Sequence, residues 1–192
     1  MFRFVEAKKI GSIQQTSAGF AQFFHKIAGA KHEKLLEKCA EQINELPRVK
    51  LEKVYSGEKI AGKAPMNFGF STHFAQPIGV GDMISCVALA VVDAPNRQQL
   101  VAHLTPSTRI RALNKMLAPY EGKDVRLFLC EGPLDYGVLK RVYLAISKLD
   151  LPRPTIIEPE SGIVIYNGEI NRIDQNQKWR ENNRDSDLVW MG

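Results

Sequence analysis

Cys86 and His103 are the residues of this chain whose types and spacing offer chemistry. A thiol beside an imidazole is typical of cysteine-based nucleophilic catalysis, because the thiolate is the reactive form and needs a basic neighbour. Cys86 lies in an apolar, β-branched run from Met83 to Val92, and His103 follows it by 103 − 86 = 17 positions. Whether the two side chains meet depends on the elements that carry them.

Two neighbouring strands are predicted to carry the pair. The run around Cys86 is apolar at both parities, which is typical of a strand buried on both faces. Residues 93–97 have turn chemistry, and Gln98–Thr105 alternates as a second strand. A turn centred near residues 95–96 leaves two registers open: Cys86 opposite Thr105 and diagonal to His103, or directly opposite His103. Either register puts both side chains on one face, whereas a slip of one residue would separate them.

The remaining pattern predicts helices and strands around this hairpin. Apolar steps of three and four residues predict helices within 17–46, after a cap at Ser107 or Thr108, and over Pro133–Leu149. Further strands are expected over Val49–Tyr55, Asn67–Phe74, Asp124–Cys130, Thr155–Glu158 and Ile163–Tyr166, the last two forming a closing hairpin. The loop Gly57–Pro65 lacks the spacing of a phosphate-binding loop and is interpreted as a flexible connection. The tail from residue 171 onward is polar, and its tip Leu188–Met191 is expected to dock back on the body.

Composition narrows the function classes. The chain has 192 residues, 44% of them hydrophobic, and a formal charge of +5. Its basic residues are spread without aromatic interleaving, so neither nucleic acid nor a membrane is the expected partner. The chain has three widely spaced cysteines, at positions 39, 86 and 130. This spacing fits neither a disulfide framework nor a zinc knuckle. We expect reduced thiols, and a cytoplasmic protein or one delivered into another cytoplasm without a Sec signal peptide.

The order of features resembles CheD, the chemoreceptor glutamine deamidase family. The resemblance rests on Ser85-Cys86-Val87 in a strand, His103 after 17 positions, Pro106 opening a helix, a strand ending Leu129-Cys130-Glu131-Gly132, a long helix before a proline, and a final β-hairpin. It covers about residues 78–170, and the residues before it have no CheD counterpart. CheD is similar in fold to the cytotoxic necrotizing factor deamidases.

The resemblance implies an α+β fold and a reaction. The fold would be a layered α/β sandwich with a mostly antiparallel central sheet and flanking helices, and the catalytic core would span 76–170. Outside this core the sequence itself predicts an N-terminal helical extension over 1–75 and a polar tail over 171–192. The reaction would be hydrolysis of a protein glutamine side chain, with Cys86 as nucleophile and His103 as base, and with no cofactor or metal. CheD carries a threonine near the position of Val80 that helps the histidine. Here Thr105, Thr72 or a backbone carbonyl is expected to orient His103 instead.

Three functions stay open at the level of sequence. The first is the deamidase, in which the amide of Cys86 and the approach Gly79–Gly81 are candidates for holding the oxyanion. The second is a thiol protease or transglutaminase using the same pair. The third is a non-enzymatic protein-interaction module in which the N-terminal helices and the Leu188–Met191 tip bind a partner. The sequence does not specify the target protein or the oligomeric state.

Overall fold

The structure is a computed structural model, and it describes residues 34–35, 37–57, 59–134, 137–173 and 188–190. The chain divides into two compact units, residues 1–41 and 42–192. Residues 34–35 and 37–44 are helical, as predicted for this stretch. The rest of the predicted N-terminal helices lies outside the described residues.

A seven-stranded sheet forms the centre of the second unit, in the order β1-β8-β7-β5-β6-β3-β11. Its strands are β1 (Arg48–Val49), β3 (Phe68–His73), β5 (Val87–Asp93), β6 (Gln98–Leu104), β7 (Arg126–Glu131), β8 (Thr155–Ile157) and β11 (Leu188–Trp190). Its strand pairs are antiparallel except that β8 runs parallel to both β7 and β1. All residues of β5 are buried, as its unbroken apolar run predicts.

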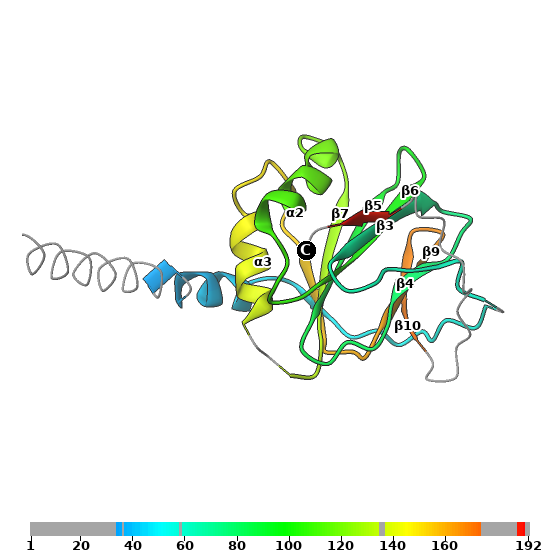
Figure 1. Ribbon diagram of the computed structural model, residues 1–192, viewed down its shortest axis with the longest axis horizontal. Coiled ribbons are helices and arrows are strands. Elements are labelled where there is room, and N and C mark those ends of the chain that lie inside the picture. Colours follow the sequence, from blue (N-terminus) through cyan, green and yellow to red (C-terminus); the bar gives the residue numbers. More distant parts are fainter. Residues whose placement is uncertain (1–33, 36, 58, 135–136, 174–187, 191–192) are drawn as a thin grey trace, which may run out of the picture. The chain divides into compact units, whose positions relative to one another are not determined.

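Helices lie over one face of this sheet, as Figure 1 shows. They are α2 (Ile110–Leu117), the short 3₁₀-helix η1 (Ala118–Tyr120) and α3 (Val138–Ile146). The predicted cap of α2 is wrong, because α2 has Arg109 at its N-cap position and no side-chain cap bond there. The Thr108 hydroxyl instead accepts the backbone N–H of Thr105, at 2.8 Å.

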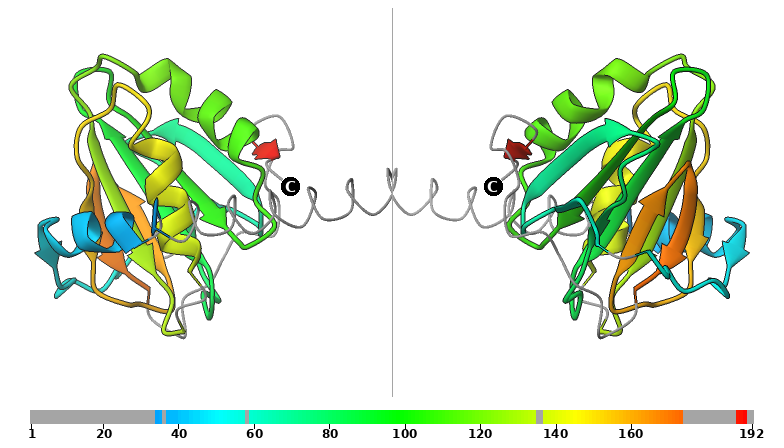
Figure 2. Two further views of the ribbon diagram at one scale, coloured as in Figure 1. Left: turned by 90° about the vertical axis from the view of Figure 1, so that its left-hand side faces the viewer. Right: turned by 90° about the vertical axis from the view of Figure 1, so that its right-hand side faces the viewer.

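A smaller sheet covers the opposite face, in the order β10-β9-β4-β2, as Figures 1 and 2 show. Its strands are β2 (Gly62–Lys63), β4 (Ile78–Val80), β9 (Ile163–Tyr166) and β10 (Glu169–Arg172). The core between the sheets joins alternate residues of β5 to buried aliphatic side chains of the small sheet, among them Ala88, Ala90, Ile78, Ile163 and Ile165. These layers confirm the predicted α+β sandwich with mostly antiparallel strands.

The closing hairpin differs from the prediction. It consists of β9 and β10, joined by Asn167 and Gly168 with φ of 50° and 73°. Positive φ at both central residues is the requirement of a type I′ turn, for which Asn-Gly is the preferred pair. β8 belongs to the large sheet, so the predicted pairing of Thr155–Glu158 with Ile163–Tyr166 is wrong.

The expected domain boundaries also need revision. β1, β2 and β3 all precede residue 75, yet they are strands of the two sheets, so the helical extension is shorter than predicted. The expected tail begins inside β10, and its tip docks back by pairing as β11 with β3. Among the described residues, no helix combines the length and the apolar character that crossing a bilayer requires.

Candidate functional site

The register of β5 and β6 decides how Cys86 and His103 lie. Val87 is opposite Leu104 and Ala88 is opposite His103. The observed register is therefore the first of the two that the sequence left open. Cys86 directly precedes β5, whose first residue Val87 is opposite Leu104, the last residue of β6. Because side chains alternate along a strand, His103 shares the face of Ala88, which is turned to the smaller sheet. The same alternation predicts this face for Cys86, two residues before Ala88.

The backbone around Cys86 is held against the end of β7. The Gly132 N–H donates to the Cys86 carbonyl, and the Leu134 N–H donates to the Ile84 carbonyl, each at 2.9 Å. A Cβ atom at Gly132 would lie 2.7 Å from the Ile84 oxygen, so only glycine permits this approach. The Cys86 segment is therefore fixed, and its thiol is free of a disulfide with 8% of the residue exposed.

His103 is buried, with 4% of the residue exposed. Burial lowers the pKa of His103 below its usual 6.5, a hydrogen bond with the Ala64 backbone opposes this change, and the charges of Lys63 and Asp82 act in opposite directions. Nε2 has no hydrogen-bond partner among the described atoms, which leaves Nδ1 as the nitrogen facing Ala64. A neutral imidazole whose Nε2 can accept a proton is the form required of a general base.

Lys63 and Asp82 form an ion pair beside His103. Lys63 ends β2 directly before Ala64, and Asp82 has a left-handed backbone (φ 58°) in the segment that leads to Cys86. The Ala64 N–H also donates to the Gly79 carbonyl of β4, at 2.9 Å. The pair thus links the segment that contacts His103 to the segment that carries the thiol.

Thr105 does not orient His103. Its hydroxyl donates to the Asn67 side-chain oxygen at 2.6 Å and accepts the Ser107 N–H at 3.2 Å. Asn67 has a φ of 65°, and its N–H donates to the His103 carbonyl at 2.8 Å. Thr105 therefore supports the loop beside the site, and the Thr72 hydroxyl is likewise occupied, by Gln76. Of the three predicted orienting groups, the structure supplies the backbone one, at Ala64.

We expect Thr105→Val to affect stability rather than activity. The change removes the donor to Asn67 and should lower the free energy of unfolding by about 1–2 kcal/mol. Any activity per folded molecule should be retained, because His103 keeps its contact with Ala64. Chemical denaturation and kinetics at a temperature where the variant is folded would measure both, with Thr105→Ser as the control. A collapse of kcat comparable to that of a His103 substitution would contradict this assignment.

The glycines before Cys86 serve close packing. Gly79 lies within β4 between β2 and β9, opposite Lys63 and Val164. A Cβ atom at Gly162 would lie 2.6 Å from the Val80 oxygen and 3.0 Å from the Gly81 Cα atom. The smaller sheet and the turn that precedes β9 therefore touch backbone to backbone here, which accounts for glycine in this approach by packing.

The other two thiols contrast with Cys86. Burial raises the pKa of Cys130 to about 12, and its sulfur lies 3.8 Å from the carbonyl oxygens of Glu131 and Glu158. A thiol with this pKa is almost wholly protonated near neutral pH and is a poor nucleophile. Cys39 is also buried and free of a disulfide. Their structural roles agree with the sequence-based interpretation of both residues as core.

Sequence reasoning missed the residues that support His103. Lys63 and Ala64 lie in the loop that was interpreted as a flexible connection, yet the loop contains β2. No local signal marks them, since a two-residue strand shows no periodicity. Gly132 belongs to the strand end on which the CheD resemblance rests, but its contact with Ile84 arises only from the pairing of distant segments.

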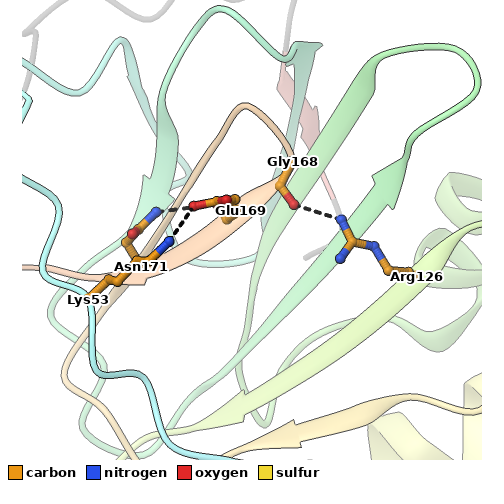
Figure 3. A network of polar contacts seen from close by, with 5 residues as sticks. All are labelled: Lys53, Arg126, Gly168, Glu169 and Asn171. Atoms are coloured by element: carbon orange, nitrogen blue, oxygen red, sulfur yellow. Dashed lines mark hydrogen bonds and ion pairs between the residues drawn. The ribbon is translucent and has the colours of Figure 1, made fainter.

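A cavity of about 380 Å³ lies at the other end of β7. It is lined by the segment Val49–Lys53, the start of β7 and the turn into β10. Figure 3 shows its polar contacts: Arg126 donates to the Gly168 carbonyl at 2.9 Å, and Lys53 pairs with Glu169 at 3.0 Å. Its lining contains no thiol or imidazole, so the chemistry of the candidate site is elsewhere.

The described part of the chain contains no group of three His, Cys, Asp or Glu side chains that could hold a metal ion. No protein-family model matches the sequence, and no curated protein shows significant similarity to it.

Proposed function

We propose that this protein is a cysteine-dependent amidohydrolase that deamidates glutamine side chains of a target protein, in a cytoplasm where its thiols stay reduced. The observation that supports the proposal is the β5–β6 register, in which Ala88 is opposite His103 and Cys86 directly precedes β5 at the same end of the large sheet. The buried Nε2 of His103 has no hydrogen-bond partner among the described atoms, the Cys86 sulfur included, so it is open to accept a proton once the thiol approaches. The choice of glutamine as substrate rests on the CheD-like order of elements.

The reaction follows from these two side chains. His103 accepts the thiol proton, and the sulfur of Cys86 attacks the carboxamide carbon to form a tetrahedral oxyanion. His103 then gives its proton to the departing nitrogen, so ammonia leaves and a thioester remains. Water, deprotonated by His103, attacks the thioester, and the side chain is released as glutamate with the thiol restored. The N–H of Cys86 is the proposed oxyanion donor, and no cofactor takes part.

Ammonia release from a glutamine-containing peptide tests the proposal. The expected result is a loss of ammonia from the peptide, with the mass change of amide to acid at glutamine and no chain cleavage. Cleaved peptide bonds would indicate a thiol protease, and incorporation of an added primary amine without net hydrolysis would indicate a transglutaminase. No reaction with any glutamine peptide or protein, together with an unreactive Cys86, would favour the interaction module.

Alkylation by iodoacetamide tests the reactivity of the thiol separately. In the folded protein we expect Cys86 to be modified before Cys130, because burial holds the pKa of Cys130 near 12. Peptide mapping after short exposure, with the unfolded protein as the control for equal intrinsic reactivity, measures the order. Protection of Cys86 until unfolding would contradict a catalytic role.

A further inference from the structure

The three most exposed large apolar side chains among the described residues belong to segments at the end of the sheet that holds Cys86 and His103. Met66, Ile84 and Leu134 have 63%, 62% and 49% of their surface exposed. The other large apolar residues exposed among the described ones, such as Val54, are at most 40% exposed. Exposed apolar groups that concentrate in one place mark interaction sites more often than scattered ones do.

Backbone contacts tie each of the three to the candidate site. Met66 forms an isolated parallel bridge with His103 itself. Ile84 lies two residues before Cys86, and its carbonyl accepts the Leu134 N–H at 2.9 Å. Three strands meet at this end of the large sheet: β6 and β7 end here and β5 begins here, because Val87 pairs with both Leu104 and Glu131. The three residues therefore lie on segments that adjoin Cys86 and His103 through the backbone, and their side chains are exposed.

We propose that Met66, Ile84 and Leu134, hereafter the apolar rim, bind aliphatic side chains that flank the target glutamine in the substrate protein. This inference rests on the proposed function, since it takes Cys86 as the point to which the glutamine is delivered. The thiol is nearly buried, so only the glutamine side chain reaches it. The residues on either side of that glutamine are left at the surface, on the rim.

The rim selects substrates by desolvation. A leucine placed against these side chains removes apolar surface from water on both partners, whereas an aspartate there would lose hydration without a partner for its charge. In hydrophobic substrate sites one methylene group changes the rate ratio by about 10–200-fold, and leucine differs from aspartate by more than that in apolar surface. The expected substrate class is thus a protein segment in which glutamine stands between large aliphatic residues.

Two blocked pentapeptides test the inference, one with leucine and one with aspartate on both sides of a central glutamine. We expect kcat/KM for ammonia release to be at least about tenfold higher for the leucine peptide. Three single variants, Met66→Ser, Ile84→Ser and Leu134→Ser, should each lower the ratio of kcat/KM for the leucine peptide to that for the aspartate peptide. The ratio should fall because KM for the leucine peptide rises. Val54→Ser, which changes an exposed apolar residue beside β10, is the matched control and should keep the ratio.

The outcomes separate the two proposals. Equal rates for both peptides, or a ratio unchanged in all three rim variants, would overturn the rim while the deamidase stands. A second readout is the protection of Cys86 from iodoacetamide by each peptide. Absence of ammonia with selective protection by the leucine peptide would overturn the deamidase and keep the apolar surface. Absence of both ammonia and protection would overturn both.

Discussion

Cys86→Ala should abolish the conversion of glutamine to glutamate and leave the fold intact. Without the sulfur no thioester can form, and loss of a nucleophile of this kind lowers kcat by about 10³-fold or more. The cost in stability should be about 1 kcal/mol, since one buried heavy atom is removed. Ammonia release and thermal unfolding measured on the same preparation would check both expectations.

Two further variants make this result specific. Cys86→Ser keeps the shape of the side chain but replaces the thiol by a hydroxyl, which is far less readily ionised, so it should be nearly as inactive. Cys39→Ala removes another buried thiol and should keep full activity. Undiminished conversion by Cys86→Ala, or loss of activity in Cys39→Ala alone, would end the proposal that Cys86 is the nucleophile.

Much of the central hairpin could be predicted because its signals are local. The apolar run of β5, the turn residues after it and the alternation of β6 each lie within a few positions. Together they favoured two registers with Cys86 and His103 on one face, but they did not exclude a slip of one residue. The structure has the register in which Ala88 is opposite His103. The geometry of the turn between β5 and β6 goes with this register. In the turn, Arg97 takes a left-handed φ of 51°, and the Asp93 side chain accepts the N–H of Asn96 at 3.2 Å.

The surroundings of His103 could not be predicted, because they come from segments far apart in the chain. Lys63 and Ala64 lie at the end of the two-residue strand β2, which brings them to His103. The hydroxyl of Thr105, which the sequence offered as a partner for His103, donates to Asn67 instead. A hydroxyl on the right face of a strand is a candidate, but its rotamer and partners depend on a loop whose conformation has no periodic signature. Face assignments follow from strand parity, whereas hydrogen-bond partners require the tertiary fold.

The second large effect is expected for His103→Gln. Glutamine occupies a similar volume but cannot accept the thiol proton, and loss of a general base costs about 10²–10⁴-fold in rate. The remaining rate should rise with pH as hydroxide takes the role of the base, whereas the wild-type rate should be flat above neutral pH. A kcat within a few-fold of wild type, which is about what an uninvolved residue would give, would exclude His103 as the base.

The acid limb of the wild-type pH profile should lie below pH 6.5. Burial lowers the pKa of His103, so the neutral base persists below the usual value and activity is lost only as the pH falls through the lowered pKa. Lys63→Met removes a cation that disfavours the imidazolium, so it should raise this pKa and move the limb to higher pH. Asp82→Asn removes an anion that favours the imidazolium and should move the limb to lower pH. Opposite displacements in kcat/KM would place the titrating group beside the Lys63–Asp82 pair, and loss of this acid limb in His103→Gln would identify His103 as that group.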